Sequence, residues 1–216
     1  MAIPKIIHYC WFGKNEMPLK EKECVAGWKK FYPDYEFKIW NEDNFDYNKC
    51  IYARQAYERG YYAFVSDYVR AKVLYEYGGI YLDTDVIAVD NIDDMLDNKA
   101  FIGFENEKFV SAAIMGAEKE HPFIKQLIEH YDKIDNKKEF CFDDNNSLLV
   151  TDILKNYYGL ELNNKEQTLD DGIKVYNDKI LSNPSGKSKT IHIFTGTWLD
   201  EKPSLKKKIC QFLKYR

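Results

Sequence analysis

The strongest pattern of hydrophobic positions is helical and runs over residues 61–77. Apolar side chains recur there about every 3.6 residues, which is the period of an α-helix. Gly78 and Gly79 follow directly and predict the end of the helix, because glycine readily adopts the left-handed backbone that closes helices. The next apolar run, residues 80–82, is short and predicts a strand. The apolar stripe of the helix consists of Phe64, Tyr68, Ala71 and Tyr75.

Shorter patterns on either side alternate between strand and helix. Residues 165–189 are polar and turn-rich, and no strand or helix is predicted in them. Strands that alternate with helices predict an α/β layered fold, and the length predicts one domain over residues 1–216. Strands are predicted at residues 5–12, 35–40, 101–104, 110–115 and 191–194, and helices at 18–31, from 122 onward, and at 147–157.

Composition narrows the class of protein. A net charge of −4 argues against nucleic-acid binding, which needs a strongly basic face. The five cysteines are odd in number and scattered, so neither a zinc ribbon nor a disulfide framework is indicated, and a reduced, cytoplasmic setting is favoured. No apolar run reaches the ~18 residues of a membrane span, and the first residues resemble a strand rather than a signal peptide.

Two aspartates follow the strand at 80–82. Asp83 and Asp85 flank Thr84, and their side chains lie on one face if the strand continues, because strand side chains alternate. Carboxylate oxygens suit Mg²⁺ or Mn²⁺, and such an ion stabilises a departing diphosphate. The simpler alternative is an acidic turn without a metal.

Asp67 and Arg70 lie on the side of the long helix opposite Lys72 and Glu76. Because so apolar a helix should be mostly buried, the first pair is expected to face inward, where buried charges need partners. Two interpretations stay open: a structural ion pair at i,i+3, or a pair that faces sugar hydroxyls beside a metal.

Several sequence blocks together resemble the family 32 glycosyltransferases, which include capsular polysaccharide synthesis enzymes and fungal α-mannosyltransferases, and more distantly the glucosylating bacterial toxins. The resemblance implies a GT-A fold, which is a Rossmann-like α/β domain with a mixed central sheet, a nucleotide-sugar donor, a divalent metal, and transfer with retention of configuration. The matching blocks are IPKIIHYCWFG, DYEFKIWNEDNFD, FVSDYVRAKVLYEYGGIYLDTDV, AAIMGAEKEHPF and IHIFTGTW.

The resemblance also implies roles for individual residues. Thr197 stands where the family usually has Ser, and DDNNSLLVT replaces a Gly-Pro pair, which leaves the acceptor side around residues 143–146 undefined. Without the resemblance, Trp11 and Trp198 fit core aromatics and His192 fits a core histidine. The implied donor-binding residues are His8, Trp11, Ser66, Asp67, Arg70, Tyr81, Asp83 and Trp198; the metal ligands are Asp83, Asp85 and His192; the catalytic residues are Asp67, Arg70, Thr197 and Trp198.

The predicted function is therefore a metal-dependent hexosyltransferase that uses Mn²⁺ or Mg²⁺. A UDP-sugar is favoured over GDP-mannose, with a glycan or lipid-linked saccharide acceptor in capsule or cell-surface polysaccharide synthesis. Residues 203–216 form either a basic amphipathic helix at the inner face of the membrane or an ordinary surface helix. The alternatives are a non-catalytic glycan-binding module and a haloacid-dehalogenase-like phosphatase, whose motif belongs on a first strand.

Overall fold

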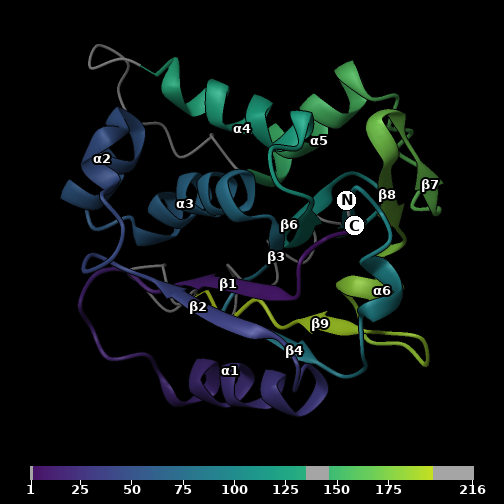
Figure 1. Ribbon diagram of the computed structural model, residues 1–216, viewed down its shortest axis with the longest axis horizontal. Helices are drawn as coiled ribbons and strands as arrows, with labels where there is room; N and C mark the ends of the chain where they lie inside the picture. The colour runs from purple at the N-terminus through teal and green to yellow at the C-terminus, as the bar shows by residue number, and fades with distance from the viewer. Residues whose placement is uncertain (1, 135–145, 197–216) are drawn as a thin grey trace, which may run out of the picture.

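The structure, a computed structural model, describes residues 2–134 and 146–196 (Figure 1). A seven-stranded mixed sheet in the order β2-β1-β3-β6-β5-β8-β7 forms the centre of this part, with a second sheet of β4 and β9. The predicted α/β class is confirmed. The strands are β1 Ile6–Cys10, β2 Glu36–Trp40, β3 Gly79–Leu82, β4 Val86–Ala88, β5 Ala100–Phe104, β6 Val110–Ala117, β7 Gln167–Thr168, β8 Ile173–Tyr176 and β9 Thr190–His192. The helices are α1 Leu19–Phe31, α2 Ile51–Glu58, α3 Tyr62–Tyr77, α4 Pro122–Asp132, α5 Asn146–Tyr157 and α6 Asp178–Leu181.

Helices cover both faces of the large sheet. In Figure 1, α2, α3, α4 and α5 lie on one side, whereas α1 lies on the other side with the small sheet. Side chains of β3 alternate between the two layers: Tyr81 packs in the core on the α3 side, and Ile80 and Leu82 pack in the core on the α1 side. Residues near the end of β3 are thus flanked by α3 on one side and by α1 on the other.

Three neighbouring strands, β2, β1 and β3, run parallel. Cys10 at the end of β1 is paired with Trp40 at the end of β2, and His8 is paired with Tyr81 of β3. The carboxyl ends of these strands therefore meet at one edge of the sheet. In α/β proteins this edge is where ligands bind.

A pair of glycines connects α3 to β3. Gly78 and Gly79 have φ angles of 66° and 109°, which L-residues with side chains rarely adopt. A Cβ on Gly79 would also lie 2.7 Å from the backbone oxygen of Ile6 in the neighbouring strand. Only glycine fits this close approach, so the helix passes into the aspartate-bearing strand without a loop.

The observed elements differ from prediction in three places. Residues 165–189 contain β8, which pairs in parallel with β5, and the short helix α6. Polar turns on both sides conceal this strand in the sequence, although Ile173 and Val175 alternate as buried positions. Helix α2 and strand β4 were also not predicted.

Some predictions fall outside the described residues. These are the roles of Thr197 and Trp198 and the C-terminal helix at 203–216. Within residues 2–134 and 146–196, none of the helices has the length and apolarity to cross a membrane. The extent of a single domain over 1–216 stays a prediction.

Candidate donor and metal site

Asp83 and Asp85 lie in a tight turn, not in a continued strand. Strand β3 ends at Leu82, and the amide of Val86 donates to the carbonyl of Asp83 at 3.0 Å. The condition under which strand alternation would place both carboxylates on one face, a continued strand, is therefore not met. The turn still brings them together, because the Asp83 amide is fixed to the carbonyl of Ala113 in β6 at 2.9 Å and the chain reverses from there.

His192 joins Asp85 through the small sheet. Strands β4 and β9 pair antiparallel, with Val86 opposite His192. His192 Nε2 lies 3.1 Å from Asp85 Oδ1, and the Thr195 amide donates to Asp85 Oδ2 at 2.9 Å. Burial alone would raise the pKa of Asp85, but the hydrogen bonds from His192 and Thr195 outweigh it and hold the pKa below its ordinary value. For His192, burial favours the neutral ring, yet the Asp85 carboxylate raises its pKa above the ordinary value.

Asp83 is held from the α3 side. Arg70 Nη2 donates to Asp83 Oδ1 at 3.2 Å, and the Tyr81 hydroxyl donates to the same oxygen at 2.9 Å. Burial raises the pKa of Asp83, and the charge of Arg70 opposes that rise. The Arg70 guanidinium also lies 4.5 Å from the centroid of the Tyr81 ring. Asp83 is thus preorganised by two buried side chains.

Arg70 also contacts Asp67, which lies one helical turn earlier on α3, and thereby links Asp67 to Asp83. Arg70 Nη2 lies 2.9 Å from Asp67 Oδ1, and Nη1 donates to the carbonyl of Ala112 at 2.7 Å. Asn146 of α5 donates to Asp67 Oδ1 at 2.9 Å. Burial raises the pKa of Asp67 to about 6, against the opposing charge of Arg70. The pair is therefore a structural ion pair that is also bonded to Asp83, and its contact with sugar hydroxyls stays a prediction.

Asp83, Asp85 and His192 form a candidate ligand set for one divalent cation. One oxygen from each carboxylate and one imidazole nitrogen all lie within 4.8 Å of one another. Oxygen ligands with one imidazole suit Mn²⁺ or Mg²⁺. The Nε2 atom of His192 already faces Asp85, and its buried Nδ1 has no hydrogen-bond partner among the described residues. The residues therefore fit a metal.

Two predicted donor-binding residues are buried. His8 is fully buried; its Nε2 bonds the Gly78 carbonyl at 2.9 Å, and its Nδ1 accepts from the Trp40 indole at 3.1 Å. Burial lowers the pKa of His8 to about 4, so the ring is neutral. Tyr81 is only 1% exposed, and its hydroxyl bonds Asp83. Both residues support the site from within, and their predicted contacts with a donor stay predictions.

Trp11 and Ser66 lie at the edge where the parallel strands end. Trp11 follows β1, is partly exposed, and donates from its indole to the carbonyl of Asn15 at 2.7 Å. Ser66 is half-buried on α3 one turn before Arg70, and its hydroxyl donates to the Tyr62 carbonyl at 3.1 Å. Their predicted contacts with a donor stay predictions.

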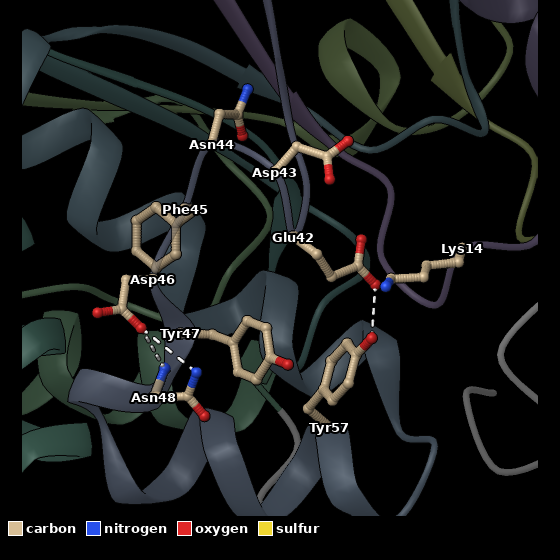
Figure 2. Close-up of a pocket in the computed structure, with 9 residues that line it drawn as sticks. All are labelled: Lys14, Glu42, Asp43, Asn44, Phe45, Asp46, Tyr47, Asn48 and Tyr57. Atoms are coloured by element: carbon tan, nitrogen blue, oxygen red, sulfur yellow. Dashed lines mark hydrogen bonds between the residues drawn. The ribbon is translucent and has the colours of Figure 1, made fainter.

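An open cavity of about 570 Å³ lies beside this edge, between the loops that follow β1 and β2 and the helix α2. Figure 2 shows Tyr47 and Tyr57 side by side; their ring centroids are 4.2 Å apart. Glu42 accepts hydrogen bonds from the Tyr57 hydroxyl at 2.9 Å and the Gly13 amide at 2.6 Å. This carboxylate ties the two loops together, and Lys14, whose charge acts on Glu42, also lines the cavity.

Two site residues were missed from sequence. Thr195 holds Asp85, and Glu105 follows β5 and bonds Ser147. Burial raises the pKa of Glu105, opposed by the nearby His192. Thr195 had a signal, since it lies in the block IHIFTGTW, whereas Glu105 lies at the end of a strand that only the fold brings near. Asn146, which holds Asp67, belongs to the range 143–146 that the sequence left without a defined role.

The fold defines the class of structure: it is a GT-A fold. A solved structure titled "PaToxG Glycosyltransferase" superposes with a TM-score of 0.58 at 20% identity, over 72% of this chain and 70% of that one. At this identity the likeness shows the fold alone.

The family follows from sequence. Residues 18–102 match the family described as "Glycosyltransferase sugar-binding region containing DXD motif", so the chain carries that family's DXD region and the predicted resemblance is confirmed. Inositol phosphoceramide mannosyltransferase 3 of Schizosaccharomyces pombe is 34% identical over 139 residues, 60% of this chain and 37% of that protein. Mannosyl phosphorylinositol ceramide synthase CSH1 of Saccharomyces cerevisiae is 32% identical, over 61% of this chain and 36% of that one. The matches thus span well under half of these relatives.

The phosphatase alternative is not supported. The aspartate turn follows β3, the third strand of the chain, and not a first strand. The matching family is one of glycosyltransferases.

Proposed function

We propose that the protein transfers a hexose from a nucleotide-sugar to a saccharide acceptor, with a divalent metal held by Asp83, Asp85 and His192. The observation that carries this proposal is the convergence of these three ligands, from a turn and a distant strand, within 4.8 Å. A binding module that only recognises glycans has no need of such a set beside a buried, fully partnered Arg70.

The nucleoside of the donor is proposed to lie along the edge from the Figure 2 cavity to the aspartate turn. The cavity lies at the ends of β1 and β2, and the turn lies at the end of β3. Neighbouring strands are about 4.8 Å apart, so the cavity and the aspartate turn are about one to two strand spacings from each other. That length suits a base and ribose beside Trp11 with the diphosphate at the aspartates.

In the proposed mechanism the bond between the anomeric carbon and the diphosphate oxygen breaks, and the acceptor hydroxyl attacks from the same face. Its proton passes to the departing phosphate oxygen, so configuration is retained. A bound Mn²⁺ or Mg²⁺ supplies charge stabilisation for the diphosphate. Arg70 fixes Asp67 and Asp83 so that they are preorganised for the transition state. A trapped covalent glycosyl-enzyme contradicts this mechanism.

The donor sugar has two candidates. The expectation of a UDP-sugar stays in the proposal, and the mannosyltransferase names of the relatives support GDP-mannose as the second. Their names also point to an acceptor linked to a lipid. A lipid-linked acceptor fits the proposed action at the inner membrane face in capsule or cell-surface polysaccharide synthesis, with the protein in the cytoplasm.

A donor screen tests the proposal. The wild-type protein is mixed with Mn²⁺ and UDP-glucose, UDP-galactose or GDP-mannose, and thermal stability and release of UDP or GDP are measured. One donor is expected to raise the melting temperature and to be hydrolysed slowly, and only with metal present. Asp85→Asn serves as the inactive control. Binding of a donor without any turnover, with or without saccharide acceptors, would instead favour the non-catalytic module.

A further inference from the structure

Helix α1 carries a buried carboxylate that the proposed mechanism does not use. Glu21 is 1% exposed, and neither of its oxygens has a hydrogen-bond partner within residues 2–134 and 146–196. The backbone amide that usually donates to a glutamate at this position is missing. Glu21 is the third residue of α1, where glutamate commonly accepts from the amide of the N-cap residue; here the N-cap is Pro18, which has no amide hydrogen.

An unpartnered buried carboxylate opposes folding. Removing it from water costs free energy that hydrogen bonds or an opposite charge normally return. Glu21 receives neither in the described structure. Such a group is expected where a ligand supplies the missing partners, because sites that bind ligands keep features that destabilise the free protein.

The position of Glu21 is set by how α1 packs on β4. The Trp28 indole donates to the carbonyl of Val86, the residue directly after Asp85, at 2.7 Å. Cys24 lies one turn earlier on the same buried face, and its thiol pKa is raised by burial and by the nearby Asp85 carboxylate. Glu21 lies one further turn toward the start of α1, and this end of the helix follows the loop that leaves β1. The buried face of α1 therefore runs beside the aspartate turn, opposite α3.

We propose that Glu21 binds a vicinal diol of the nucleotide-sugar, an inference that rests on the proposed function. A free carboxylate repels phosphate, so the diphosphate is excluded as its partner. Ribose and hexose both offer two adjacent hydroxyl donors, and a carboxylate with two free oxygens accepts one bond from each. Glu21 thus acts on the donor from helix α1, an element that carries none of the predicted site residues.

The test uses the full chain and the donor that stabilises the wild type. Glu21→Gln and Glu21→Met are compared with Glu23→Gln, which changes an exposed neighbour on the same helix. Calorimetry measures the binding of the sugar nucleotide, of UDP or GDP, and of MnCl₂ alone, and thermal unfolding is followed without ligand. We expect Glu21→Met to raise the melting temperature and to weaken binding of the sugar nucleotide about tenfold or more, with a smaller loss in Glu21→Gln and none in Glu23→Gln.

The outcomes separate the sources of the diol. Equal losses for the sugar nucleotide and for UDP or GDP assign the contact to ribose, whereas a loss confined to the sugar nucleotide assigns it to the hexose. Unchanged binding in both Glu21 variants overturns the proposal, as does weaker binding of MnCl₂ alone, which would make the partner a cation. If the wild type binds no sugar nucleotide, the proposed function fails first and independently of Glu21.

Discussion

Two helices place buried charges beside the same aspartate turn, and they do so in opposite ways. On α3, Asp67 and Arg70 have partners: the Arg70 guanidinium bonds Asp67, Asp83 and a backbone carbonyl. On α1, Glu21 is equally buried but has no hydrogen-bond partner in the part of the chain that the structure describes. The first arrangement is preorganised and gives a site its shape. The second leaves bonding capacity open, as expected for a group that acts when a ligand arrives.

The difference also separates two kinds of energetic role. Removing a partner from the α3 network leaves the remaining buried charges uncompensated in a low-dielectric interior, which destabilises the protein. Neutralising Glu21 removes an unpaired charge and is expected to stabilise it. Substitutions can therefore distinguish positioning from binding at two places on either side of one turn.

The largest expected effect is on the transfer rate, and it follows from substitution of Asp85, the proposed metal ligand between the two helices. Asp85→Asn removes a carboxylate that both binds the proposed cation and accepts from Thr195. If metal binding contributes about 4 kcal/mol to transition-state stabilisation, the transfer rate falls about a thousand-fold. Kinetics with saturating donor and Mn²⁺ measure this. Asp90→Asn, an exposed aspartate outside the site, is the matched control and should keep wild-type activity; an active Asp85→Asn refutes the metal assignment.

Breaking the α3 network is the next largest effect. Arg70→Met leaves Asp67 and Asp83 buried without their shared cation and is expected to lower the free energy of unfolding by about 3–5 kcal/mol. Lys72→Met on the exposed side of the same helix removes only the surface pair with Glu76, 3.3 Å apart, and should change stability by less than about 0.5 kcal/mol. Urea denaturation compares the two, and equal effects would show that the network is not needed for stability.

A single hydrogen bond to Asp83 tests the supporting role of Tyr81. Tyr81→Phe removes the hydroxyl that donates to Asp83 at 2.9 Å while the ring stays in the core. Groups that orient metal ligands affect metal affinity by about 10–100-fold, so Mn²⁺ binding should weaken by about tenfold. Calorimetric titration measures the affinity, with Tyr77→Phe on the exposed end of α3 as control. Unchanged affinity means that Arg70 alone orients Asp83.

The smallest effect is the pH dependence of the α3 network. Burial raises the pKa of Asp67 to about 6 in the folded protein, above its ordinary value of 3.8. The stabilisation that the raised pKa of Asp67 contributes is complete below pH 3.8, and it is lost as the pH rises through about 6. Without metal, the unfolding free energy of the wild type relative to Asp67→Asn should therefore decline between about pH 4 and pH 6. Parallel curves for the two proteins contradict the raised pKa.

Much of the sheet was predictable because local patterns agree with the tertiary fold. The apolar stripe of α3, the glycine pair and the short strand after it describe the centre of the site within one stretch of chain. Strand β8 escaped prediction because polar turns surround four residues whose alternation shows only when β5 pairs with them. His8 was assigned to the donor because of its motif, whereas pairing with Trp40 and Gly78 makes it a buried structural residue.

By itself, the sequence determined the α/β class, the resemblance to DXD glycosyltransferases, and the residue types that a metal and a sugar nucleotide require. The tertiary structure alone decided that the two aspartates meet in a turn, that β9 brings His192 to Asp85, and that Glu21 lies buried without a partner. The physical reason is distance along the chain. Helix periods and glycine stops act over a few residues, whereas contacts between residues 21, 83, 146 and 192 exist only after the sheet has assembled them.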